Sequence, residues 1–167
     1  MLINLLSKNI IPISIFSVLV IAIAFSFSEL IKAEKKLKLE TETMLDKRVW
    51  YNPKDVSNFF QQIDKTPEGI NIYIWMHKFP DVIFPLAYGT FFAASIFYLY
   101  DREIDWKLAI PLLATIFDLG ENFTTIRLAN SYPKISASLA WLACGCTSIK
   151  WTMFVLSLVF ILFGLFT

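Results

Sequence analysis

The sequence contains few of the residues that most often build metal and redox sites. Only one histidine and two cysteines occur among its 167 residues, so a zinc or haem site made from imidazoles is not expected. Cys144 and Cys146 stand two positions apart. This spacing fits neither a disulfide framework nor the Cys-x-x-Cys motif of redox enzymes. We therefore predict no metal and no cofactor.

The chain also has no excess of charge of either sign. Its 15 basic and 14 acidic residues give a formal net charge of +1. Such a chain has no basic field that would attract the phosphates of DNA or RNA. Nucleic acid is therefore not expected among its partners.

Apolar residues, by contrast, are abundant and gathered into long blocks. They make up 56% of the chain, against about 45–50% in soluble domains. Each block approaches or exceeds the roughly 20 residues needed to cross a bilayer. The first is longer than the apolar region of a signal peptide and lacks a small-x-small cleavage site before Glu29, so we interpret it as a retained span. The four blocks cover residues 10–31, 80–100, 107–129 and 147–167. They predict an all-α integral membrane four-helix bundle, a single domain over residues 1–167 with the lipid bilayer as its first partner.

The segment at residues 32–69 is polar and mixed in charge, and we expect it to form a helical part outside the membrane. A helix should begin at Pro53, with Asn52 as N-cap and Asp55 in the first turn. Four apolar residues repeat along it at helical spacing: Val56, Phe59, Phe60 and Ile63. This stripe indicates a helix that either lies on the membrane surface or covers one end of the bundle. Of the two alternatives, the surface helix is the commoner.

Prolines divide the second apolar stretch. Residues 70–100 are too many for one crossing at about 1.5 Å of rise per residue. Pro80 and Pro85 each remove a backbone hydrogen bond, so a kink is predicted within residues 79–84. Thr66, in the turn "KTPEG", is expected to cap the helix that follows.

The third apolar block carries polar residues on one side only. At about 100° per residue, one arc holds Asp118, Glu121, Asn122 and Thr125. The opposite face holds Leu112, Ile116, Leu119 and Phe123. We therefore expect the carboxylates to face other helices and the aliphatic side chains to face lipid.

Buried carboxylates need partners, and the sequence offers candidates on neighbouring spans. An ionised carboxylate at mid-membrane costs at least about 2.5–3.5 kcal/mol. Lys150 lies inside the last apolar block, and Asp81 lies between the two prolines. We predict that Lys150 bridges Asp81 and Glu121 and that Asn122 completes the hydrogen bonds. Asp118, the deepest and least compensated acid, is expected to be protonated.

Several other residues can extend or surround this polar cluster. The candidate contributors are His77, Tyr88, Thr125 and Tyr132. His77, however, has no second metal ligand nearby, and the commoner interpretation is an interfacial side chain. Small residues on the second and fourth spans favour close helix packing over redox chemistry: Gly89, Ala93, Ala140, Ala143, Cys144 and Cys146.

The order of these motifs resembles a set of small bacterial four-span membrane proteins of unassigned function. In that set an Asp precedes Phe-Pro-x-x-Tyr, an Asp-x-x-Glu-Asn stands in the third span, and a Tyr-Pro and a Lys-Trp follow. The resemblance covers about residues 50–167. The matching positions are Asp81, Phe84, Pro85, Tyr88, Asp118, Glu121, Asn122, Tyr132, Pro133, Lys150 and Trp151. It implies this architecture in a bacterial cytoplasmic (inner) membrane and brings no chemistry with it. The relatives often carry a Gly-Arg pair where this chain has Gly69 followed by Ile70.

Two functions are compatible with these features. The first is a non-catalytic accessory protein that binds lipid, a protein partner or further copies of itself, in which the polar residues chiefly join helices. The second is a membrane enzyme or proton-coupled carrier for a lipid-like substrate. There Asp118 and Glu121 would act as general acid and base and Lys150 would stabilise an anion. The sequence favours the first, because it shows no recognisable catalytic set.

Overall fold

The computed structural model describes residues 2–39, 43–100 and 102–166, with side chains from residue 13 onward. It is all-helical, with 82% helix and no strand in these ranges. The helices are α1 (Leu2–Leu37), η1 (Leu45–Lys47), α2 (Pro53–Ile63), α3 (Gly69–Lys78), α4 (Pro80–Leu99), η2 (Trp106–Leu108), α5 (Ala109–Ser131) and α6 (Ala137–Gly164). The all-α prediction is confirmed.

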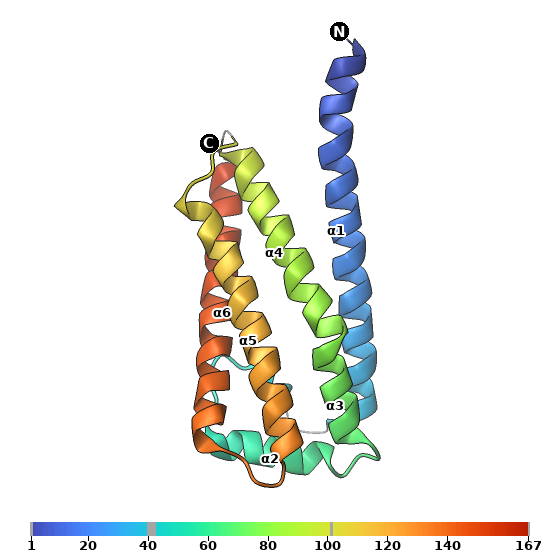
Figure 1. The fold of residues 1–167 in the computed structure, drawn as a ribbon, viewed down its shortest axis with the longest axis vertical. Coiled ribbons are helices and arrows are strands. Elements are labelled where there is room, and N and C mark those ends of the chain that lie inside the picture. The colour runs from blue at the N-terminus through green and yellow to red at the C-terminus, as the bar shows by residue number, and fades with distance from the viewer. Residues whose placement is uncertain (1, 40–42, 101, 167) are drawn as a thin grey trace.

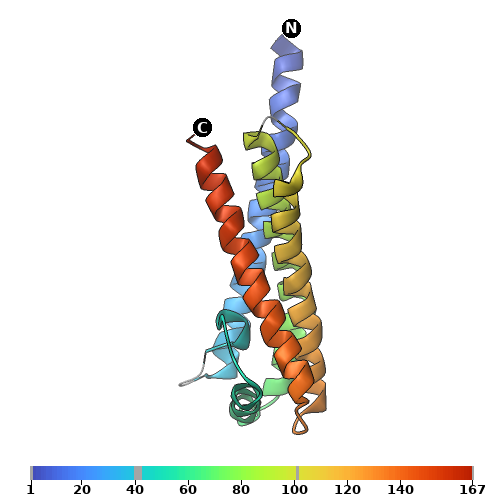
Figure 2. The same ribbon diagram turned by 90° about the vertical axis from the view of Figure 1, so that its left-hand side faces the viewer.

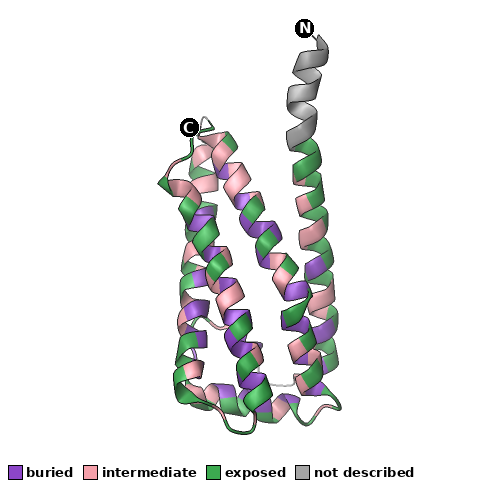
Figure 3. Cartoon of the chain, in the orientation of Figure 1, coloured by how far each residue is buried: buried purple, intermediate pink, exposed green. Residues whose placement is uncertain are grey.

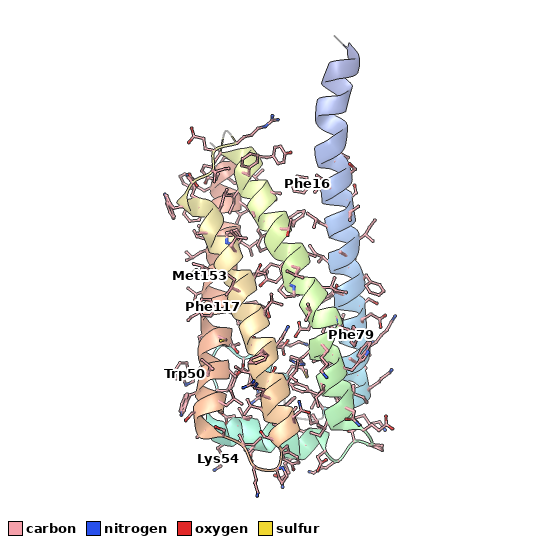
Figure 4. The ribbon with its side chains drawn as sticks, viewed as in Figure 1. Phe16, Trp50, Lys54, Phe79, Phe117 and Met153 are labelled. Carbon is pink, nitrogen blue, oxygen red and sulfur yellow. The ribbon has the colours of Figure 1, made fainter. Side chains whose placement is uncertain are left out.

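Four long helices lie side by side, and the short α2 crosses them at one end (Figure 1). α1 packs along α3 and α4, α4 packs on α5, and α5 makes its widest contact with α6. The first turns of α1 extend past the ends of the other helices, a feature also visible in the second view (Figure 2). On α1, Phe16 points toward α4, where its ring centre is 5.3 Å from that of Phe91 (Figure 4).

Three helical stretches are long and apolar enough to cross a membrane: Ile13–Leu37, Gly69–Leu99 and Ala137–Gly164. They correspond to the first, second and fourth predicted spans. The third corresponds to α5, which is not among the three and which carries the acidic residues.

The two faces of α5 divide as predicted. Its polar arc is buried, whereas Ile116 on the opposite face is 60% exposed and Leu112 and Phe123 are also exposed (Figure 3). Leu119 is half-buried. The inward orientation of the carboxylates is therefore confirmed.

The sequence signals around α2 are also confirmed. The Asn52 side chain accepts hydrogen bonds from the backbone N–H groups of Lys54 and Asp55, and Asp55 accepts one in return from the N–H of Asn52. Pro53 is the first helical residue. The apolar stripe is completely buried: Val56, Phe59, Phe60 and Ile63. Of the two alternatives for α2, the structure shows the helix that covers the bundle end, and the surface helix is wrong.

The predicted kink is a break between α3 and α4. Phe79, between Lys78 and Pro80, has φ −118° and ψ −81°, outside helical geometry. A residue that precedes proline is disfavoured in the α region, because the proline ring clashes with its backbone. Pro85, further along, stays inside α4.

The prediction for Thr66 is wrong. α3 begins at Gly69 after Glu68, whose backbone is left-handed (φ 59°) and whose side chain makes no cap. The Thr66 hydroxyl instead donates to the backbone carbonyl of Leu37 at 2.9 Å. It therefore ties the turn between α2 and α3 to the end of α1.

The segment at residues 32–69, which we expected to be helical, is helical only in part. α1 continues to Leu37, η1 covers Leu45–Lys47 and α2 covers Pro53–Ile63, and the other described residues before Gly69 are not helical. After α1 ends at Leu37, the described part of the connection, residues 43–52, returns along α6. Here Trp151 Nε1 donates to the carbonyl of Asp46 at 2.9 Å, and the Ser148 hydroxyl donates to that of Val49 at 2.7 Å. Three of its side chains are buried in the core: Met44, Leu45 and Tyr51. We call residues 43–52 the return loop.

Small residues allow the helices to approach closely, as predicted. Ala140, Ala143 and Cys144 are fully buried, and both cysteines are free thiols. A Cβ on Gly89 of α4 would come within 1.8 Å of the Thr115 hydroxyl oxygen on α5. No larger residue fits there unless Thr115 moves.

Candidate functional site

The first part of the site arises from a proline inside α4. Pro85 has no N–H, so the carbonyl of Asp81, four residues earlier, has no helical donor. Asn122 of α5 supplies one, because its Nδ2 donates to this carbonyl at 2.6 Å. Asn122 therefore completes the hydrogen bonds of a neighbouring helix. The sequence predicted that Asn122 completes the hydrogen bonds around Lys150, whereas in the structure its amide donates to the backbone carbonyl of Asp81.

The second part is an ion cluster between α5 and α6. Lys150 Nζ lies 2.5 Å from Oε2 of Glu121, an ion pair whose angle falls outside hydrogen-bond geometry, and it donates to Oδ1 of Asp118 at 3.2 Å. The Tyr88 hydroxyl donates to Oδ2 of Asp118 at 2.9 Å. The predicted pair with Glu121 is confirmed, whereas the predicted pair with Asp81 is wrong. Asp118 has two donors, so the expectation that it is the least compensated acid is also wrong.

The second oxygen of Glu121 is bound by residues that the sequence did not indicate. The Thr147 hydroxyl donates to Oε1 at 2.6 Å, and the Tyr51 hydroxyl lies 3.1 Å from the Thr147 oxygen. Burial, with a further contribution from the charge of Glu121, raises the pKa of the Tyr51 phenol. The Tyr51 phenol therefore stays protonated and donates a hydrogen bond to the Thr147 hydroxyl. Thr147 lies one helical turn before Lys150, a spacing that could have indicated it, but nothing marked Tyr51 in the loop.

His77 forms the third part of the site, together with Asp81. It is fully buried, so the interpretation as an interfacial residue is wrong. Its Nδ1 lies 3.0 Å from the Tyr73 carbonyl. Because a carbonyl only accepts, Nδ1 carries the hydrogen. Nε2 then faces Oδ2 of Asp81 at 3.7 Å, and neither atom has a hydrogen-bond partner among the described residues. Two acceptors without a donor therefore face each other here.

The remaining candidate contributors have other positions. Thr125 is buried, but its hydroxyl donates to the backbone carbonyl of Glu121 at 2.9 Å, within the same helix. Tyr132 packs on the core beside α2, with its ring centre 6.0 Å from that of Phe60. The structure thus brings Asp118, Glu121 and Lys150 into one cluster and Asp81 beside His77. It leaves Thr125 and Tyr132 without a side-chain contact to these groups.

A cavity of about 190 Å³ adjoins both acidic groups. Its apolar lining comes mainly from α1, α4 and α6, and its charged side chains come from α1, the return loop, α4, α5 and α6. Glu34 of α1 and Lys47 of the return loop, both in its lining, form an ion pair at 2.6 Å. The lining residues central to the site are Phe27, Ile31, Asp81, Asp118, Lys150 and Trp151.

Metal binding has no support in this arrangement. Within the described ranges, no group of three or more His, Cys, Asp or Glu side chains could hold a metal ion. The acids of the cavity and of the ion cluster behind it instead meet lysine, histidine, threonine and tyrosine side chains.

Comparisons with known proteins add no relative. No family model matches the chain, and no curated protein and no solved structure matches it. The class that the coordinates define is an all-helical protein with three membrane-length apolar helices and a buried polar cluster.

Proposed function

We propose that the chain is an integral membrane protein that binds a lipid-like amphiphile in the cavity between α1 and α6. The observation that carries this proposal is the position of Lys150 and Asp118. Both lie at the polar side of a cavity that is otherwise lined mainly by apolar side chains. An amphiphile would place its head at this polar side and its chain against Phe27 and Ile31.

The size and chemistry of the cavity support this function. Its volume of about 190 Å³ exceeds that of a roughly 150 Å³ apolar cavity known to bind benzene. Ligand sites typically combine apolar walls with a few oriented polar groups. The cavity therefore accommodates a small head and the first carbons of a chain, and the rest of the chain would extend between α1 and α6.

In this proposal α5 also crosses the membrane, so that the whole chain forms a four-span bundle. The burial of its polar arc and the exposure of Ile116 support a helix that faces lipid on one side only. A bacterial cytoplasmic membrane follows from the resemblance to small four-span proteins, which we retain as part of the proposal. A second copy or another protein would bind outside the cavity, in the role of an accessory assembly.

A non-catalytic role is favoured, because the strongest ionic groups already neutralise one another. Lys150 is engaged by Glu121 and Asp118, which leaves it little capacity to stabilise a reacting anion. The alternative, a proton-coupled carrier or enzyme, rests on one observation. His77 Nε2 and Asp81 Oδ2 face each other without hydrogen bonds beside the cavity, and such a pair can take up or release a proton.

Photolabelling tests amphiphile binding. The protein in phosphatidylcholine nanodiscs is irradiated with a decanol that carries a diazirine, and the labelled peptides are mapped by mass spectrometry. We expect labels on residues 27–34 and 151–154. The variant Ile31→Trp should fill the cavity and remove these labels. Ile21→Trp, a lipid-exposed change on the same helix, is the matched control and should leave them. Labels spread along all lipid-facing surfaces, with no effect of Ile31→Trp, would contradict the proposal.

A further inference from the structure

The charges around the cavity are not balanced. Five carboxylates lie in its wall or directly behind it: Glu34, Asp46, Asp81, Asp118 and Glu121. Lys150 is the lysine that meets this group, and it contacts Asp118 and Glu121. Lys47 is paired with Glu34. Within the described ranges, neither Asp46 nor Asp81 forms an ion pair with a lysine or arginine, and Asp81 meets the His77 ring at 3.7 Å.

Asp81 is the clearest sign of a missing partner. It is only 4% exposed, it lines the cavity, and its Oδ2 has no hydrogen bond within the described part of the chain. Oδ1 of Asp46, in the same lining, is buried and unpaired as well. Buried carboxylate oxygens are expensive to leave without a donor. Two acids that each carry such an oxygen line the same cavity, which indicates a ligand that donates hydrogen bonds.

The other walls suit a cation. Aromatic rings contribute to the lining: Phe27, Phe84, Tyr88, Trp151 and Phe154. Ring faces attract ammonium groups, and more strongly where water is excluded. Lys150 Nζ already lies 5.9 Å from the centre of the Trp151 ring.

We propose that the cavity selects a single-chain amphiphile with a protonated amine head, which donates to Asp81 and Asp46 while its chain lies along α1 and α6. This inference rests on the proposed amphiphile binding and specifies the charge of the head. Three N–H bonds of a primary ammonium supply donors for both acids. An anionic head would face five carboxylates and two lysines, Lys47 and Lys150, which are both already paired.

Competition against the photolabel tests the selection. Decylamine, decanol and decanoate have chains of equal length and differ in charge, and butylamine keeps the amine without the long chain. Each is added at the same mole fraction in the nanodiscs, or in solution for butylamine. We expect decylamine to displace the label at about one tenth of the decanol concentration or less, since a hydrogen bond to a charged group contributes at least that factor. Decanoate should be the weakest of the three.

Variants localise the effect. Asp81→Asn should raise the decylamine concentration needed for displacement by about 10-fold and leave that of decanol unchanged, which also reports that the cavity is intact. Asp46→Asn is the second variant, for the case in which Asp81→Asn does not fold. Glu103→Gln removes an exposed acid outside the cavity and should change nothing.

The outcomes separate the two proposals. If no label reaches the cavity, amphiphile binding itself is wrong. If the label is present but decanol or decanoate competes as well as decylamine, the cationic preference is wrong. Equal potency of butylamine would show that a soluble amine, and not an amphiphile, is the ligand. An unchanged decylamine response in both aspartate variants would also overturn the inference.

Discussion

The ammonium of Lys150 lies 2.5 Å from a carboxylate oxygen of Glu121, and both side chains are buried between α5 and α6. Loss of either member leaves a buried charge without its partner, which typically costs about 3–5 kcal/mol. We predict that Lys150→Met and Glu121→Gln each destabilise the protein strongly and that the double variant costs at least about 1 kcal/mol less than their sum. Unfolding in detergent, followed by tryptophan fluorescence, measures this coupling.

The matched control for this cycle is Asp81→Asn combined with Lys150→Met. Asp81 is not an ion-pair partner of Lys150 in the structure, so this coupling should be clearly smaller. Additive costs for Lys150 and Glu121, or a larger coupling to Asp81, would contradict the observed arrangement.

A second prediction concerns the hydrogen bond that compensates for a proline. Asn122→Leu leaves the carbonyl of Asp81 without a donor, at a cost of about 1–3 kcal/mol. Pro85→Ala restores an N–H to that carbonyl within α4. The cost of Asn122→Leu should therefore be smaller in the Pro85→Ala background, as measured by thermal unfolding. An equal cost in both backgrounds would show that Asn122 stabilises something else.

The close contact of Gly89 with Thr115 gives a third prediction. Gly89→Ala places a methyl group 1.8 Å from the hydroxyl oxygen of Thr115, and overpacking of this kind costs about 1–3 kcal/mol. Thr115→Ala removes that oxygen and should recover most of the loss. Gly145→Ala is the control, because nothing lies within 4 Å of its Cβ position. This control should be neutral or stabilising by about 0.5–1 kcal/mol. Equal effects of the two alanines on the unfolding midpoint would count against the contact.

The return loop supplies the fourth prediction. Trp151→Phe keeps an aromatic ring and removes the hydrogen bond to the Asp46 carbonyl. Hydrogen exchange should become faster in residues 44–51 and stay unchanged in α2. The comparison variant is Trp141→Phe on the same helix, because the Trp141 ring packs beside that of Trp50, near the other end of the loop, with 5.8 Å between ring centres. The same acceleration in both variants would show a general loosening of α6.

Asn52→Ala tests the N-cap of α2. The variant loses the side-chain acceptor for two backbone N–H groups, which typically costs about 1 kcal/mol. Asn58→Ala, at an exposed position inside the same helix, provides the control and should be neutral or slightly stabilising. Thermal unfolding of both variants under the same conditions measures the two changes in stability. An equal loss of stability in both variants would contradict the role assigned to the cap.

Sequence periodicity was sufficient for features within one helix. The polar arc of α5 and the start of α2 follow from helical spacing and capping chemistry, and both are observed. The partner of Lys150 was predicted only in part, because it depends on the relative depth of different helices. The break at Phe79 and the turns between helices set that depth, and a periodic pattern does not encode it.

Residues of the return loop were the least predictable. Tyr51 belongs to the site only because residues 43–52 fold back onto α6, and their short contacts with Ser148 and Trp151 have no sequence signature. His77 was misplaced for a related reason. A lone histidine beside a lysine resembles an interfacial residue, but the turn of α3 directs its ring inward to Asp81.

The position of the return loop determines the route by which a ligand would enter the cavity. The cavity wall includes three residues of this loop, Met44, Asp46 and Lys47, on the side where α1 ends. The hydrogen bond from Trp151 to the Asp46 carbonyl holds the loop in this position. A proposed ligand would then arrive sideways from the bilayer, between α1 and α6. The rate at which the ligand enters would rise with its mole fraction among the lipids. Adding water around the membrane would leave that rate unchanged.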